Sequence, residues 1–296
     1  MKKLFGLFLL TLAFLAPDFA QAATRFWVGG TGTWDSTTTT HWATTSNGAG
    51  GASAPVAGDA ITFDASSGGG TVTPDSSIDS IAFLSLSAGG FTSGTLAFNT
   101  NNPNMAFTST VNFSGAVTRT INTGSGTWTL SSSATGSIWD ITTNTGLTGT
   151  FSNTTISLTG NSVSRAFVGG TQTYGAITIS NNSALGNVRF QATNTYASIT
   201  AGSGNTLYMS TTTVTGALTL TGTASAPVGL LSDSPPNATT ITVGAASPIT
   251  WGGVSGVTKA GAGSITATNS FDMGRNTGVS ITPPSAGGGG GRIIGG

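Results

Sequence analysis

The chain has no cysteine and a single histidine, His41. Without cysteine, neither a disulfide nor a Cys-His nucleophile can form, and one histidine rarely supports a zinc site. A Ser-His-Asp triad would have to use His41, and no Gly-x-Ser-x-Gly motif accompanies it. We therefore expect no catalytic residue and a protein that is not an enzyme.

Charge is also scarce, because Asp, Glu, Lys and Arg together make up 6% of the 296 residues and every acid is Asp. A soluble domain usually has about 25%. Once an N-terminal signal peptide is removed, seven Lys/Arg and eight Asp remain, a net charge of −1. Such a chain has no field that attracts nucleic acid or an anionic membrane. The lack of glutamate, a good helix former, also disfavours helices.

The N-terminus has the features of a secretory signal peptide, assigned to residues 1–22. Met1-Lys2-Lys3 is positive, Leu4 to Ala16 is apolar, and Ala20-Gln21-Ala22 has the form of a signal-peptidase site. A membrane-spanning helix, the alternative, needs about 20 apolar residues, and Pro17-Asp18 ends this run earlier. We predict cleavage after Ala22, export to the cell surface or the extracellular space, and no membrane span after cleavage.

The remaining chain alternates apolar residues with Thr, Ser and Asn in short packets, which indicates β-strands rather than helices. Clusters of Gly, Asn and Pro between the packets are typical of turns. An all-β fold is therefore predicted. The clearest packets are Thr127–Leu130, Thr155–Leu158, Ala176–Ile179, Leu207–Met209, Leu218–Leu220 and Thr240–Val243.

A repeat runs through these packets, since Thr173–Thr178 is echoed by Thr195–Thr200. A period near 20 residues without a helix predicts a right-handed parallel β-solenoid, or β-helix, over residues 68–282. Tandem β-sandwiches, the alternative, also alternate but do not explain this period. The aliphatics expected to stack inside the solenoid, spaced by 21, 22 and 19 residues, are Ile156, Ile177, Ile199 and Leu218.

Residues 23–67 differ in composition from the repeats that follow, because they contain Trp27, Trp34 and Trp42 together with His41. A solenoid exposes the end of its core at the first repeat and needs a terminal cap. We predict that this segment is a Trp-rich N-terminal cap whose rings pack in the core. The alternative is a glycan-binding site in which sugars stack on the three tryptophans.

Four acids lie close together in the sequence: Asp59, Asp64, Asp75 and Asp79. Capping of turns is the favoured role, because short carboxylates accept hydrogen bonds from nearby backbone N–H groups. A calcium site is the alternative, since hard cations prefer clustered oxygens, and no other cofactor is expected. If the segment is extended, Asp75 and Asp79 lie about 13 Å apart, whereas glycoside hydrolysis needs two carboxylates within about 5 to 9.5 Å.

After Pro283-Pro284 the chain changes again, and residues 283–296 include five consecutive glycines, Gly287–Gly291. Such a run is typical of a flexible linker, so a Pro/Gly-rich tail is predicted. In the alternative, Arg292-Ile293-Ile294 pairs with the edge of a neighbouring subunit.

Two segments carry a family resemblance. The first comprises Arg25–Trp34, His41-Trp42, Pro55–Asp59 and Phe63-Asp64, and the second is Ala267–Gly278. They resemble the first and last repeats of bacterial secreted β-solenoid surface proteins, autotransporter-like adhesins among them, and of phage-encoded fibre-like structural proteins. The resemblance implies a solenoid at a cell or virion surface and brings no catalytic residues with it.

These observations lead us to expect an exported, non-enzymatic structural or adhesive protein of a surface or fibre. Self-association and a cell-surface glycan are the partners considered. A phage-encoded virion fibre or decoration protein is one alternative function. A polysaccharide-binding or depolymerising protein is the other.

Overall fold

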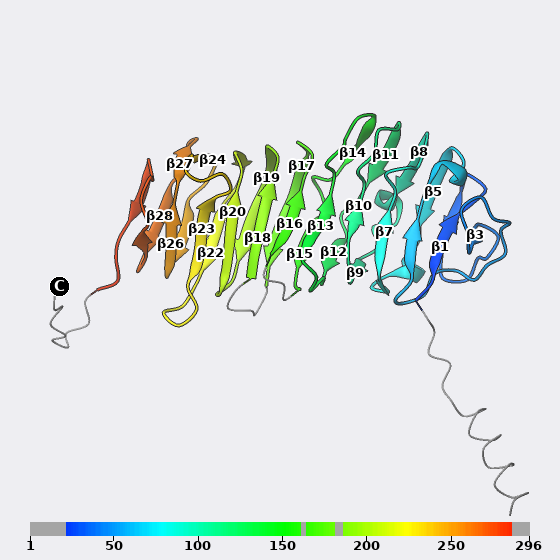
Figure 1. The fold of residues 1–296 in the computed structure, drawn as a ribbon, viewed down its shortest axis with the longest axis horizontal. Helices are drawn as coiled ribbons and strands as arrows, with labels where there is room; N and C mark the ends of the chain where they lie inside the picture. The colour runs from blue at the N-terminus through cyan, green and yellow to red at the C-terminus, as the bar shows by residue number, and fades with distance from the viewer. Residues whose placement is uncertain (1–21, 161–163, 181–185, 286–296) are drawn as a thin grey trace, which may run out of the picture.

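A computed structural model describes residues 22–160, 164–180 and 186–285 and shows an all-β protein with long, mostly parallel sheets (Figure 1). The strands lie side by side along one axis, and their order in the chain follows that axis from end to end. The prediction of an all-β fold is confirmed. The assigned signal peptide, apart from Ala22, and the tail after Ser285 lie outside the described residues.

The strands form three sheets, which we name A, B and C. In spatial order, sheet A contains β3 (Trp42–Ala43), β1 (Thr24–Trp27), β4 (Ala60–Thr62), β7 (Ser85–Ser87), β10 (Val111–Asn112), β13 (Gly136–Asp140), β16 (Arg165–Val168), β18 (Gly186–Gln191), β20 (Asn205–Met209), β23 (Val228–Ser232), β26 (Gly252–Ser255) and β29 (Phe271–Asp272). Sheet B contains β2 (Gly32–Trp34), β5 (Gly70–Pro74), β8 (Gly94–Ala97), β11 (Arg119–Asn122) and β14 (Leu147–Thr150). Sheet C contains β6 (Ala82–Phe83), β9 (Met105–Phe107), β12 (Thr127–Leu130), β15 (Thr155–Leu158), β17 (Thr173–Ile179), β19 (Asn194–Ala201), β22 (Leu218–Thr221), β25 (Ser247–Thr250), β28 (Ile265–Thr268) and β30 (Val279–Ile281), with β21 (Thr212–Val214), β24 (Thr239–Val243) and β27 (Val257–Ala260) branching from β19.

From β4 to β15 the chain visits the sheets in a fixed order, A then B then C, and then returns to A. Apart from the strands at the ends of the sheets, each strand pairs in parallel with its counterparts one repeat before and one repeat after, and the β1–β3 pair is the only antiparallel one among the described strands. Immunoglobulin-like sandwiches have antiparallel sheets. The parallel ladders therefore do not fit the tandem-sandwich alternative.

The register confirms the predicted row of aliphatics. Ile156 lies opposite Ile177, Ile177 opposite Ile199, and Ile199 opposite Leu218, and all four side chains are fully buried. Thr and Ser residues alternate with them and face outward, as the period of two in a strand requires. The sequence echo also lies in register, because Tyr174 is opposite Tyr196.

Sheet B ends at β14, and the chain then passes directly from β16 to β17 and from β18 to β19. In these middle repeats one long strand of sheet C, β17 with seven residues or β19 with eight, replaces two shorter ones. The repeats that carry the 21- and 22-residue spacing therefore have no strand in sheet B, and neither do the described repeats that follow them.

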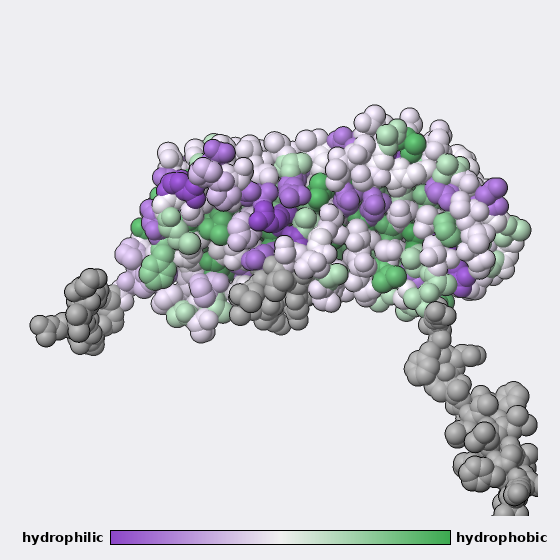
Figure 2. Space-filling model, viewed as in Figure 1, coloured by the Kyte–Doolittle hydropathy of each residue, from purple (hydrophilic) through white to green (hydrophobic). Residues whose placement is uncertain are grey.

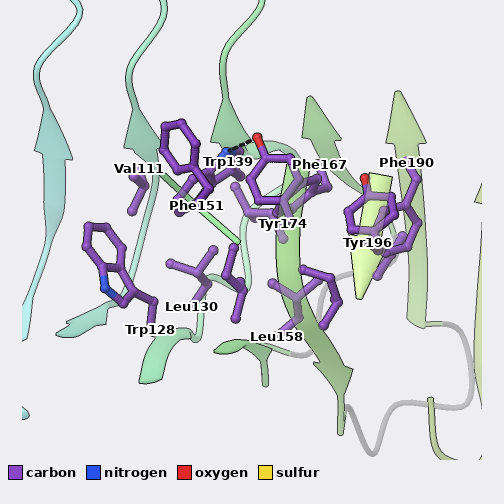
Figure 3. Close-up of a cluster of buried hydrophobic side chains, with 14 of the residues drawn as sticks. Val111, Trp128, Leu130, Trp139, Phe151, Leu158, Phe167, Tyr174, Phe190 and Tyr196 are labelled. Atoms are coloured by element: carbon purple, nitrogen blue, oxygen red, sulfur yellow. Dashed lines mark hydrogen bonds between the residues drawn. The ribbon is translucent and has the colours of Figure 1, made fainter. Parts of the chain in front are cut away.

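The interior is an unbroken stack of aromatic and aliphatic side chains (Figure 3). Trp139 stacks on Phe167 with ring centroids 5.6 Å apart, and Tyr174 stacks on Tyr196 at the same distance. The indole Nε1 of Trp139 donates to the Tyr174 hydroxyl at 3.1 Å, and that hydroxyl donates to the carbonyl of Gly169 at 2.7 Å. Burial raises the pKa of the Tyr174 hydroxyl well above its usual range.

Two arginines, Arg119 and Arg165, are buried in this interior. Arg119 begins β11 on the same face as Ile121, and its side chain is fully buried. Its guanidinium donates only to backbone carbonyls, which lie in the turn before β11 and in the corresponding turn before β14, one repeat later. Burial lowers the pKa of Arg119. The carbonyl oxygens belong to Phe113, Gly115, Val117, Thr143 and Thr145.

Candidate functional site

The N-terminal tryptophans lie inside the molecule. Trp27, Trp34 and Trp42 each have 0% exposure. Trp42 meets Trp27 and Trp34 edge-on, with centroids 5.1 and 5.7 Å away. Phe63 packs against all three. Because no ring face is open to solvent, the alternative of sugar stacking on these tryptophans needs correction: their positions favour core packing at this end.

His41 packs at the rim of the same cluster. Its ring stacks on Trp27 at 4.7 Å, and its Nδ1 lies 3.0 Å from the carbonyl oxygen of Val28. The backbone beside it is tight, since a Cβ on Gly32 would lie 2.6 Å from the Nε2 of His41. The contacts of this histidine are those of a packing residue.

The burial of Trp34 leads to a first testable prediction. Trp34→Ala would leave a large cavity, so we expect a loss of roughly 3–5 kcal/mol in unfolding free energy. Thermal melting with glycan-array binding on the same variant measures the effect, with the exposed Val56→Ala as control. An unchanged melting temperature with lost sugar binding would contradict the packing role.

The four acids considered for calcium do not converge. Asp64 accepts from the backbone N–H of Ser66 at 2.8 Å, and Asp75 accepts from that of Ser77 at 2.7 Å, each at the start of a short 3₁₀ turn, η1 (Ala65–Ser67) or η2 (Ser76–Ile78). Asp79 accepts from the N–H of Asn104 in the next repeat. The carboxylate of Asp59 accepts hydrogen bonds from the backbone N–H groups of Ala23 and Val56. Within the described part of the chain, no three His, Cys, Asp or Glu side chains are placed to share a metal ion.

Several of the remaining charged groups have local partners, whereas the guanidinium of Arg165, which is 1% exposed, has no hydrogen-bond partner among the described residues. Asp35 loses some hydration by burial, which raises its pKa, but hydrogen bonds from Thr38 and Thr37 outweigh this and lower the pKa to about 2. Burial raises the pKa of Asp233, while Arg189, whose Nη1 lies 2.6 Å away, opposes the shift. The guanidinium of Arg189 also lies over the ring of Tyr208 at 4.8 Å. These are contacts of a charged surface cluster.

An apolar groove of about 720 Å³ lies near the C-terminal end of the described residues. The groove is lined in part by Gly229 and Gly253, which are register neighbours in β23 and β26. A Cβ on Gly229 would lie 2.7 Å from Thr206, and one on Gly253 would lie 2.6 Å from the sulfur of Met273. The side chains of Thr206 and Met273 can therefore approach the backbone this closely only because both positions lack a Cβ.

Two hydrophobic side chains at the groove are highly exposed to solvent. Phe271 is 61% exposed and Met273 is 60% exposed, more than any other large hydrophobic residue in the described part of the chain. Most of the face drawn in Figure 2 is instead near-neutral in hydropathy, with small hydrophobic and hydrophilic patches scattered over it. The groove can offer apolar contact, with few polar groups to orient a substrate.

Sequence reasoning missed this groove. Glycines inside a strand often mark a close approach of another group, and Gly229 and Gly253 are such a signal. Phe271 and Met273 are two residues apart, the spacing of inward-facing residues in a strand, so the sequence pattern does not distinguish them from core residues.

Comparisons with protein-family models, with curated proteins and with solved structures find no match to this chain. Across residues 22–160, 164–180 and 186–285, no helix has the length and hydropathy needed to cross a bilayer. The functional inferences below therefore depend on the residues of this chain.

Proposed function

We propose that the mature protein is an exported, non-enzymatic structural or adhesive protein, built as a right-handed parallel β-solenoid with residues 23–67 as its N-terminal cap. The observation that carries the proposal is the continuous parallel register from β4 to β30, filled by one stack of apolar side chains. Repeats of this kind stack only on their neighbours and produce a long, regular surface. Elongated surfaces suit a fibre or surface layer better than they suit an enclosed reaction site.

The adhesive contact is assigned to the C-terminal end, with a second copy of the chain as its occupant. Sheets A and C end there in β29 and β30, and no described strand pairs with their outer edges. At the other end, β3 closes sheet A in the antiparallel sense. Open strand edges and exposed apolar patches both favour association, and Phe271 and Met273 place such a patch beside the open edge. Two copies that meet through the same end form a closed, two-fold pair.

The mass of the mature protein in solution tests this contact. Light scattering over a concentration series should give a dimer that the double variant Phe271→Ser, Met273→Ser weakens at least ten-fold. The matched control is Val56→Ser with Leu84→Ser, because these are the other two exposed large hydrophobics in the described residues. A monomer at all concentrations, or equal weakening by the control, would overturn the assignment. Turnover of a polysaccharide by the purified protein would overturn the non-enzymatic proposal.

A further inference from the structure

The residue that cleavage after Ala22 would leave first, Ala23, is already tied into the fold. Its backbone N–H donates to Oδ1 of Asp59 at 2.8 Å, and its carbonyl accepts from the N–H of Ala60 at 2.8 Å. Directly after it, Thr24 lies opposite Ala60 in the β1–β4 ladder. Ala22, on the other side of the bond to be cut, is exposed.

Asp59 is a strong acceptor for this position, because its side chain is only 2% exposed. Its second oxygen, Oδ2, accepts from the N–H of Val56 at 3.1 Å. The nearest cationic group is Arg25, whose Nε lies 3.4 Å from Oδ2 while its Nη2 donates to Ser53. A buried carboxylate is costly unless it is paired and hydrogen-bonded, and among the described residues Oδ1 accepts only from the neutral N–H of Ala23.

We propose that removal of the signal peptide completes this site: the new α-ammonium of Ala23 forms an ion pair with Asp59 and locks the first strand of the mature protein. The inference rests on the proposed export and on cleavage at this bond. A signal peptidase adds one water across the bond, so that Ala22 leaves as a carboxylate and the nitrogen of Ala23 becomes –NH₃⁺. The nitrogen keeps its place beside Oδ1 and gains a positive charge and two further donors.

The consequence is that processing stabilises the end of the solenoid. The amide N–H of Ala23 already donates to an ionised acceptor, and the positive charge on the new ammonium adds Coulomb attraction to that hydrogen bond. The pairing also fixes the position of the cut, because a chain that begins one residue earlier carries its ammonium about 3.8 Å further along the backbone. Such a chain keeps the neutral amide at Asp59.

Thermal melting at about pH 6, where an α-amino group is protonated, tests the pairing on full chains that begin at Ala23. Acetylation of the N-terminus removes its charge, and we expect it to lower the melting temperature by about 2–6 °C. A chain that begins at Ala22 should melt at the acetylated value. In Asp59→Asn, acetylation should have no further effect.

The comparison of free and acetylated chains needs no mutation, so it decides the question even if Asp59→Asn fails to fold. Equal melting temperatures for the two forms, or an equal drop on acetylation in Asp59→Asn, would overturn the ion pair. Intact-mass measurement of exported material reports separately on the cleavage site. A cut elsewhere would refute the proposed processing, while the melting comparison would still report on the contact.

Discussion

Replacing Ile177 with aspartate is expected to cost more than 4 kcal/mol of unfolding free energy and to lower the melting temperature by at least 8 °C. Ile177 is fully buried between its register neighbours Ile156 and Ile199. A carboxylate there would have no partner in the apolar stack and would disturb the repeats on both sides. Circular dichroism during heating measures the change.

The neighbouring residue provides a matched control. Thr178 belongs to the same strand but faces outward, in register with Ser157 and Thr200. Thr178→Asp should therefore change the melting temperature by less than about 2 °C, since surface substitutions usually stay within about 0.5 kcal/mol. If Ile177→Asp melts like Thr178→Asp, the inward assignment of this row is wrong.

Arg119→Met is expected to destabilise the protein by about 3–5 kcal/mol, although methionine fits an apolar core. The substitution removes the donors that five backbone carbonyls in two successive turns share. These carbonyls lie at the corners between strands, and only that of Thr143 is also given a backbone donor, the N–H of Gly115 at 2.8 Å, among the described residues. The loss of the guanidinium donors at the other four carbonyls is expected to cost more free energy than burial of the apolar methionine side chain contributes.

Urea denaturation of two further variants separates hydrogen bonding from charge. Arg119→Lys keeps the charge but has three donors in place of the guanidinium fork, so we expect a loss between those of the wild type and Arg119→Met. Arg275→Met, at an exposed arginine that donates to the carbonyl of Pro236, should cost less than about 1 kcal/mol. A stable Arg119→Met variant would show that water replaces the guanidinium.

The sequence predicted the all-β fold and the stacked row from Ile156 to Leu218, because alternation and spacing are both visible in the short middle repeats. It did not predict sheet B. Leu86, Val111 and Trp139 are register neighbours but lie 25 and 28 residues apart. The extra strand and its turns lengthen these repeats unequally, and unequal lengths hide a period.

The site was harder to predict than the fold. Arg119 lies two residues before Ile121, so strand parity alone places it inward, but a charge in a strand suggests solvent unless its carbonyl partners are known. The sequence predicted a cap for the three tryptophans, with a sugar site as the alternative, and their burial in the structure favours the cap. The Ala23–Asp59 contact joins residues 36 positions apart, a distance over which composition carries no information.

Because every parallel ladder links a strand only to its counterparts in the adjacent repeats, nothing in the fold sets how many repeats there are. Duplication of a whole repeat would preserve the ladder pairing between adjacent strands and lengthen the molecule, and loss of one would shorten it. The few side-chain contacts that span two strands, such as the Arg189–Asp233 ion pair, would have to lie outside the altered repeat. Length can therefore change over evolution independently of the two ends, where Asp59 holds the first strand and Phe271 lies exposed at the last.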